Sequence, residues 1–257
     1  MQKQKTFTKL VLLTVLIVTV ATMLIAFSRR DPGSLTFAAQ EKTSKSEDEK
    51  KMPIAVYSAP LPADSAERAL RLARSGRYDK RFTVPFDETS PDTTGRSTIS
   101  DWYIYMSALP ATESDAVVLG EVISANGYIS SDRTAAYSEF AIRVNNVFKD
   151  DGRLSRSSTI AVREGADVQL PSGRIIRYEI VHQGMPRIGR QYVFFLKHNE
   201  QGDDYTILTG YEIRKNHVFP LDEVEPFTAY GKYDESTFLS AVREAIAQPS
   251  EKRGLNQ

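Results

Sequence analysis

The chain has 257 residues, with 33 basic and 33 acidic side chains and no cysteine. This length accommodates one good-sized domain with additional segments, or two small domains. Because 41% of the residues are apolar and 26% are charged, the composition excludes a wholly disordered, collagen-like or multi-span membrane chain. The lack of cysteine excludes disulfides, thiolate metal sites, cysteine nucleophiles and lipid attachment through cysteine.

The balanced net charge conceals an uneven distribution. Residues 1–30 carry five basic side chains and no acidic one, which leaves 28 basic against 33 acidic side chains in residues 31–257. A domain that binds duplex nucleic acid needs a net basic face. We therefore expect no nucleic-acid partner.

Residues 10–27 form an uninterrupted apolar segment without a charge. An α-helix of this length spans about 27 Å, close to the ~30 Å hydrocarbon core of a bilayer. Lys3, Lys5 and Lys9 precede it, so the positive-inside rule places residues 1–9 in the cytoplasm and the main domain outside it, with the membrane as a partner. The alternative is a signal peptide cleaved before Ala39, which yields a secreted protein.

Residues 28–60 are expected to be a disordered linker, since the stretch from Gln40 to Lys51 has no apolar residue. Residues 61–100 predict a short helix at 64–75 followed by an irregular connection, with Asp64 as the N-terminal cap and Gly76 as the stop.

Basic residues recur every three positions along this helix. One interpretation is a cationic surface for anionic lipid or an acidic partner, and the other is a solvated helix face. The residues are Arg68, Arg71, Arg74 and Arg77.

Residues 101–250 predict the main domain, because the apolar period changes to two. A bulge is expected near Val147, a hairpin turn at 171–173, a central strand at 192–197 that is apolar on both faces, and a helix at 235–248 capped by Asp234. The expected strands are 116–124, 140–144, 158–163, 168–170, 174–181, 192–197 and 205–209, and residues 211–219 are expected to add a last hairpin that turns at Lys215 and Asn216. Residues 251–257 are expected to be a tail.

These elements predict a mainly β fold, an antiparallel OB-like barrel or sandwich with a C-terminal helix, preceded by a membrane helix and a disordered tether. The stretches DAVVLGEVISANG (115–127), YSEFAIRVNNVFKDD (137–151) and GRQYVFFLK (189–197) resemble netrin-like, OB-fold-type barrels, including those of uncharacterised secreted or membrane-anchored bacterial proteins. The resemblance covers residues 115–220 and implies architecture only, because the inhibitors of that family depend on cysteines that this chain lacks.

No motif for a cofactor, a metal or a nucleophile is present, so we expect none of these groups. The three histidines stand apart, without the spacing of a zinc site. Glu164 with Asp167 or Glu179 is the carboxylate pair considered for glycosidase chemistry, which needs two carboxyl groups about 5–10 Å apart. Asp203 and Asp204 are expected in a solvated turn, with a calcium site as the alternative.

Aromatic side chains are the feature best suited to binding, since exposed rings stack on sugars or unstacked bases; the alternative is that they fill the core. The loop 182–187 is the least regular of the β region and loops on rigid scaffolds often carry binding. The candidate ligand-binding residues are Tyr128, Tyr137, Tyr178, His182, Arg187 and Tyr205.

The predicted function is a membrane-anchored, extracytoplasmic binding or assembly module of the cell envelope, with a protein or glycan partner. The alternative is a cofactor-free envelope hydrolase that uses paired carboxylates. Between the two, we favour a protein that is not an enzyme.

Overall fold

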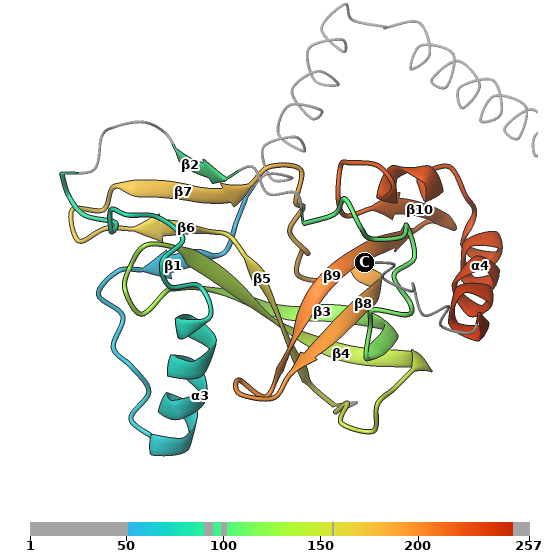
Figure 1. The fold of residues 1–257 in the computed structure, drawn as a ribbon, viewed down its shortest axis with the longest axis horizontal. Helices are drawn as coiled ribbons and strands as arrows, with labels where there is room; N and C mark the ends of the chain where they lie inside the picture. Colours follow the sequence, from blue (N-terminus) through green and yellow to red (C-terminus); the bar gives the residue numbers. More distant parts are fainter. Residues whose placement is uncertain (1–50, 90–94, 99–101, 156, 249–257) are drawn as a thin grey trace, which may run out of the picture. The chain divides into compact units, whose positions relative to one another are not determined.

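The computed structural model describes residues 51–89, 95–98, 102–155 and 157–248, and Figure 1 shows their fold. The elements described below belong to one unit, Met52–Gln257. The predicted membrane segment 10–27, most of the linker and the tail 251–257 lie outside the described residues. None of the helices in the described ranges has the length and apolarity needed to cross a membrane.

The larger sheet has six strands, ordered β10-β9-β5-β4-β3-β8. Its strands are β3 (Ala116–Ile129), β4 (Ala136–Lys149), β5 (Thr159–Glu164), β8 (Gln191–Asn199), β9 (Asp204–Arg214) and β10 (His217–Pro220). β8 pairs with both β3 and β9, so the strand pairings run from β3 through β4, β5, β9 and β8 back to β3. Every pairing is antiparallel except the short one between β5 and β9, which is parallel.

The smaller sheet has four strands, ordered β1-β6-β7-β2. They are β1 (Ile54–Val56), β6 (Ala166–Gln169), β7 (Ile175–Ile180) and β2 (Gly95–Thr98). β6 and β7 form the predicted hairpin, and Gly173 adopts a positive φ of 88° in its turn.

Two strands correct the predicted organisation. β1 lies within residues 28–60, which we expected to be disordered, and β2 lies within the connection expected to be irregular. Both pair in parallel with strands more than 80 positions away in the sequence, β1 with β6 and β2 with β7. Strands of three and four residues are too short to show a period, so only the distant backbone partner defines them.

The predicted strand alternation in the main domain is confirmed. The expected bulge in β4 is also present, because Val117 pairs with Lys149 and Val118 pairs with Val147, so that Phe148 has no opposite residue. β3 extends to Ile129, five residues beyond the predicted end, because it crosses into the region of the smaller sheet.

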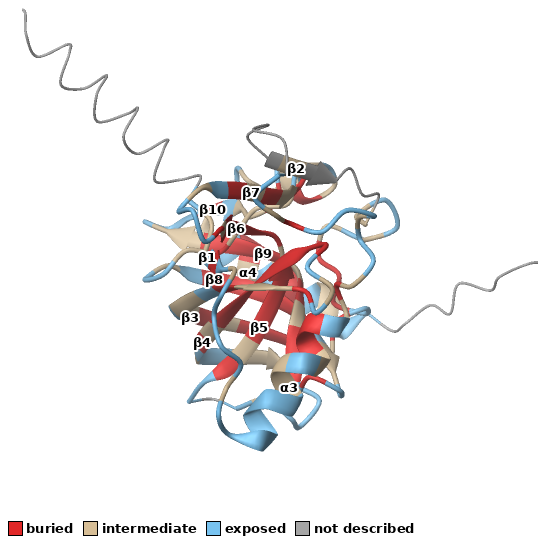
Figure 2. Ribbon diagram, turned by 90° about the vertical axis from the view of Figure 1, so that its left-hand side faces the viewer, coloured by how far each residue is buried: buried red, intermediate tan, exposed pale blue. Residues whose placement is uncertain are grey.

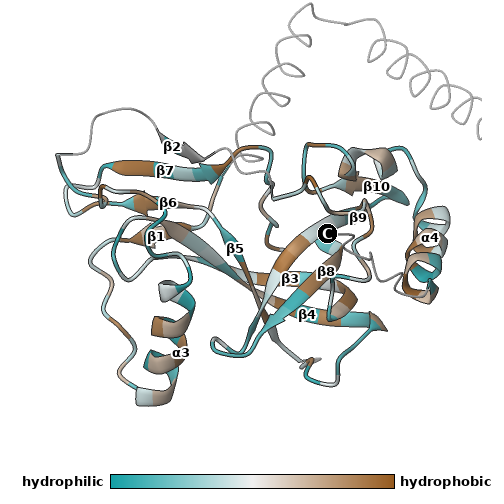
Figure 3. Cartoon of the chain, in the orientation of Figure 1, coloured by the Kyte–Doolittle hydropathy of each residue, from teal (hydrophilic) through white to brown (hydrophobic). Residues whose placement is uncertain are grey.

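The core of the larger sheet explains why β8 is apolar on both faces. Tyr192, Phe194 and Leu196 pack in a cluster to which all five strands of the returning ladder contribute. Val193 and Phe195 join a second cluster together with the C-terminal helix. Figure 2 shows the buried residues concentrated on the strands, and Figure 3 shows apolar segments along β3 and β8.

The C-terminal helix α4 (Glu235–Ala247) forms where the sequence predicts it. The Asp234 carboxylate accepts a hydrogen bond of 2.9 Å from the backbone N–H of Thr237, which caps the first turn. Phe238 and Val242 are buried in the cluster formed with β8, β9 and the short 3₁₀ helix η1 (Phe227–Tyr230).

The first described helix, α3 (Ser65–Gly76), also begins as predicted. Asp64 Oδ1 accepts from the backbone N–H of Glu67 at 2.8 Å. Gly76 does not act as a left-handed stop, because Arg77 follows in the right-handed helical region and forms the C-cap. Most of α3 is exposed, and its buried residues are Arg74 and Ser75.

Candidate functional site

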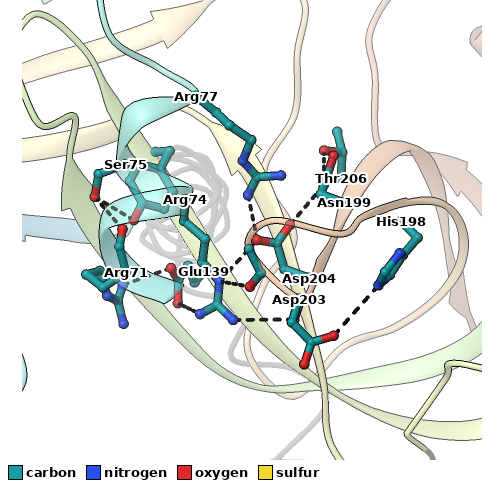
Figure 4. Close-up of polar contacts among 12 residues, drawn as sticks. Arg71, Arg74, Ser75, Arg77, Glu139, His198, Asn199, Asp203, Asp204 and Thr206 are labelled. Carbon is teal, nitrogen blue, oxygen red and sulfur yellow. Dashed lines mark hydrogen bonds and ion pairs between the residues drawn. The ribbon is translucent and has the colours of Figure 1, made fainter. Parts of the chain in front are cut away.

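The arginine row, which consists of Arg68, Arg71, Arg74 and Arg77, forms neither a free cationic surface nor a solvated helix face. Arg71, Arg74 and Arg77 leave the helix toward two carboxylates on the larger sheet, as Figure 4 shows. Only Arg68 is exposed, and its guanidinium donates to the carbonyl oxygens of Pro62 and Ala63. The row therefore fixes α3 to the strands instead of forming a free cationic face.

Arg74 is the central member of this row and is 8% exposed. Its Nε donates to Asp204 Oδ2 at 3.0 Å and to the carbonyl oxygen of Gly202 at 2.8 Å. Its Nη1 donates to Glu139 Oε2 at 3.3 Å. One guanidinium thus joins α3 to β4 and to the turn between β8 and β9.

Asp204 is 1% exposed, so the expectation that it lies in a solvated turn is wrong. It accepts hydrogen bonds from Arg74, from Arg77 Nη2 at 2.5 Å and from Asn199 Nδ2 at 2.9 Å. Asp203, next to it, does remain solvated, with its side chain 78% exposed. The buried negative charge of Asp204 needs positive charge beside it, and Arg74 and Arg77 supply that charge.

Glu139 is the second carboxylate of the cluster. Arg71 Nη1 lies 2.8 Å from its Oε1, an ion contact without the alignment of a hydrogen bond. Burial raises the pKa of Glu139 above the usual range, against the opposing effect of Arg71 and Arg74. Burial likewise raises the pKa of the neighbouring Tyr137 to about 12.

Gly202 permits this close approach. A Cβ at that position would lie 2.3 Å from Asp204 Oδ2 and 2.9 Å from Arg74 Cγ. Any larger residue would therefore push Arg74 away from the turn.

A groove of about 700 Å³ lies beside the same helix. One wall is the chain from Val56 through Pro62 to α3, and the other is the end of β3 with the connection that follows it. Val56, Leu61 and Leu72 line the groove and are 47%, 51% and 44% exposed. Large aliphatic side chains exposed together in one concave region are typical of an interaction site.

Two arginine–tyrosine pairs close the groove on the side of the strands. Arg71 Cζ lies 3.3 Å from the ring centroid of Tyr128, and Arg133 Cζ lies 4.6 Å from that of Tyr57. Arg133 Nη1 also donates to the Tyr57 hydroxyl at 2.9 Å. These contacts hold both rings in place along the groove.

Of the six residues predicted to bind a ligand, only Tyr128 lines this groove. Tyr137, Tyr178 and Tyr205 are 0%, 0% and 4% exposed, so at these positions the alternative holds that the rings fill the core, and none of the three lines the groove. Tyr137 stacks on Tyr78 with ring centroids 4.8 Å apart. Tyr137 and Tyr178 belong to one core cluster, and Tyr205 belongs to the cluster of the five paired strands.

The loop that contains His182 and Arg187 packs against the chain after β10 instead of standing free. Gly184 N–H donates to the buried Asp222 at 3.0 Å, and a Cβ on Gly184 would lie 1.8 Å from the carbonyl oxygen of Leu221. His182 is exposed and adopts a positive φ of 66°, while the backbone N–H of Arg187 donates to the Tyr192 hydroxyl. The structure does not bring these two residues to the groove.

Two of the three carboxylates considered for hydrolysis, Asp167 and Glu164, are engaged by neighbouring side chains. Arg177 binds both oxygens of Asp167, at 2.9 and 3.0 Å. Glu164 accepts from the Tyr178 hydroxyl and lies 3.2 Å from Arg81 Nε. Among the described residues, no three histidine or acidic side chains are placed to hold a metal ion.

Sequence reasoning missed Glu139 and Asp204 as partners of the arginine row. A signal does exist for Glu139, which interrupts an apolar strand between Tyr137 and Phe140. An acidic residue in such a strand requires a cation, and the unexplained arginines of the preceding helix supply it.

Comparison with protein-family models, with curated proteins and with solved structures finds no match for this chain.

Proposed function

We propose that the chain is a membrane-anchored, extracytoplasmic binding module whose groove beside α3 takes an extended segment of a partner protein. The groove carries this proposal, because about 700 Å³ falls within the range of ~300–1,000 Å³ that ligand sites occupy. Its exposed aliphatic residues favour a polypeptide partner. A glycan is disfavoured, because Arg71 already covers one face of the Tyr128 ring on which a sugar would stack.

The architecture that we propose for the supporting domain is an OB-like barrel. The support is the order in which five strands return on themselves, first–second–third–fifth–fourth, with a parallel contact between the third (β5) and the fifth (β9). A single apolar cluster to which all five strands contribute also favours a closed arrangement.

The location rests on the sequence. The uncharged segment 10–27 and the lysines before it favour an anchor that delivers residues 52–248 to the outside of the membrane. Protease added to spheroplasts, whose cytoplasmic membrane is intact, should then degrade the main domain. Protection of the main domain in spheroplasts, with degradation only after lysis, would contradict this location.

The binding proposal is tested by measuring the affinity of the full-length protein for an array of short peptides. We expect selected peptides to share apolar side chains, and Leu72→Asp to weaken their binding about tenfold or more, because a charge replaces an apolar contact. Leu72 is 44% exposed, so the variant should fold.

Ile188→Asp is the matched control, since Ile188 is 61% exposed and does not line the groove. Equal affinity of both variants would contradict a polypeptide site in the groove. Selective binding to a glycan array that Leu72→Asp abolishes would transfer the site to the glycan class.

A further inference from the structure

β1 lies at one edge of the smaller sheet, because it pairs with β6 on one side and with no strand on the other among the described residues. In a parallel pair, every second residue of a strand forms the hydrogen bonds to its neighbour. On β1 these residues alternate from Pro53, whose carbonyl oxygen accepts from β6 at 2.9 Å, to Tyr57, whose N–H donates to β6 at 2.9 Å. The backbone N–H and C=O groups of Ile54 and Val56 therefore point away from β6, to the open edge.

Three of these four backbone groups have no partner. The carbonyl oxygen of Val56 accepts from Ala59 N–H at 3.0 Å. The N–H of Val56 and both the N–H and the C=O of Ile54 have no hydrogen-bond partner in the described part of the chain. Ile54 and Val56 are 51% and 47% exposed, so this edge is accessible. An unpaired, accessible strand edge is a site where an extended polypeptide adds through backbone hydrogen bonds.

The approach of β3 does not close this edge. A Cβ on Gly127 would lie 2.6 Å from the carbonyl carbon of Ile54 and from the nitrogen of Ala55, but 2.9 Å from the Ile54 oxygen. An atom in front of a carbonyl oxygen is nearer to the oxygen than to the carbon. β3 therefore lies over the plane of this peptide, and the direction of the C=O bond remains free for a further strand.

The side chains of β1 define which residues an added strand would carry. Ala55 is buried, whereas Ile54 and Val56 are large, aliphatic and exposed. Both lie on the same face of the strand, because they are two positions apart. Every second side chain of a neighbouring strand lies on that face as well, so aliphatic residues at alternate positions would cover Ile54 and Val56.

The groove beside α3 has a surplus of negative charge. The charged side chains that line it are Asp64, Glu67, Arg71 and Arg133. The charge of Arg71 is already matched by Glu139, at 2.8 Å, so two carboxylates remain against one cation, Arg133. Asp64 caps the helix, but Glu67 is exposed and its side chain has no hydrogen-bond or ion-pair partner within the described ranges. A basic residue of a bound segment would balance this charge.

We propose that a partner protein adds an extended segment to the open edge of β1 as a further strand of the smaller sheet. The segment has aliphatic side chains at alternate positions beside Ile54 and Val56 and, where it continues through the groove, a lysine or arginine facing Glu67. This inference rests on the proposed function, because Val56 belongs both to the groove and to the open edge. It adds the mode of backbone bonding and the charge of the partner segment.

The test follows hydrogen exchange of single amides in the full-length protein, with the peptide acetyl-Val-Lys-Val-Lys-Val-Lys-Val-Lys-amide as the probe. This peptide should bind with a dissociation constant of about 1 mM or tighter. In the free protein the amides of Ile54 and Val56 should exchange rapidly, whereas that of Tyr57 should be protected by its bond to β6. At about ten times the dissociation constant of the peptide, exchange at Ile54 and Val56 should slow about tenfold, and exchange at Tyr57 should not become faster.

Two pairs of variants separate the contributions of backbone and charge. Val56→Pro removes the outward N–H and keeps the pairing with β6, since an edge strand tolerates proline where the N–H faces solvent. It should bind the peptide about fivefold more weakly than Val56→Ala, which loses the side chain and keeps the N–H. Glu67→Gln should weaken the peptide about two- to fivefold. Glu200→Gln is its matched control, because the Glu200 side chain is 81% exposed and does not line the groove.

The outcomes distinguish failure of strand addition from failure of the groove. If peptides bind in a manner that depends on Leu72, but exchange at Ile54 and Val56 is unchanged, the groove stands and strand addition is overturned. Equal affinity of Val56→Pro and Val56→Ala also overturns strand addition, and the exchange data on the wild type decide the question if Val56→Pro does not fold. Unchanged affinity in Glu67→Gln rejects a basic partner segment. Absence of binding by every peptide, including those of the array, overturns the proposed function and this inference together.

Discussion

The attachment of α3 to the strands predicts that Asp204→Asn is severely destabilising. The side chain of Asp204 is 0% exposed and accepts from Arg74 at 3.0 Å and from Arg77 at 2.5 Å. Removing one partner of a buried ion pair costs about 3–5 kcal/mol, because the remaining charge is left buried and uncompensated. Arg74 keeps Glu139 and the carbonyl oxygen of Gly202, so we expect the lower end, about 3 kcal/mol.

The assay is chemical denaturation of the full-length chain followed by the fluorescence of Trp102. For a domain of about 200 residues, a loss of ~3 kcal/mol also lowers the melting temperature by roughly 6–12 °C. Arg143→Met is the matched control, because it breaks a pair of 2.6 Å whose side chains are 56% and 27% exposed and should cost at most about 1 kcal/mol. In the double variant Asp204→Asn, Arg77→Met, the loss should be smaller than the sum of the single losses.

An Asp204→Asn loss no larger than that of Arg143→Met would refute the buried ion pairs. The double variant decides between two causes of a large loss. If its loss equals the sum of the single losses, then Asp204 and Arg77 do not interact, and the destabilisation comes from local rearrangement of the turn.

Two further predictions concern close packing and pH. Gly127→Ala should cost about 1–3 kcal/mol of unfolding free energy, because a Cβ there would lie 2.6 Å from backbone atoms of Ile54 and Ala55. Gly76→Ala should not destabilise the protein, because the nearest atom to a Cβ at that position lies 4.0 Å away. Denaturation curves of the two variants check this, and equal effects would contradict the contact between β1 and β3. Burial raises the pKa of Tyr137 from 10.0 to about 12, so its contribution to stability is complete below pH 10 and is lost as the pH rises through 12. Tyrosinate absorbance in the wild type and in Tyr137→Phe checks this; a group that titrates near 10 in the folded protein and disappears in the variant would contradict it.

The β strands of the main domain were predictable because their alternation reflects burial by neighbouring layers. β8 shows this most clearly, with Tyr192 and Phe194 directed to one cluster and Val193 and Phe195 to another. The caps of both helices were predictable as well, since Asp64 and Asp234 act on residues only three positions away.

Features that depend on distant partners were not predictable. β1 and β2 exist only through parallel pairing with β6 and β7, and short segments carry no period of their own. The burial of Arg74 and Ser75 on α3 was missed, because basic residues that recur along a helix indicate an exposed face. A buried arginine is identified only when its carboxylates, here on β4 and β9, are placed in space.

The residues of the candidate site were also predictable only in part. Tyr128 was found because it is an aromatic residue near a strand end, yet the same argument selected Tyr137 and Tyr178, which are buried. Leu61 and Leu72 were not selected, because single exposed apolar residues carry no signal until the fold brings them together.

The most direct test of this account is hydrogen exchange of the α3 amides in the full-length protein. If Arg71, Arg74 and Arg77 hold the helix against β4 and β9, the α3 amides should exchange far more slowly than those of an isolated helix of this length. The Asp204→Asn variant should lose this protection of α3, whereas the amides of β8 should stay protected. Rapid exchange throughout α3 in the wild-type protein would contradict the account, because the arginines would then not hold the helix and the groove would lack one of its walls.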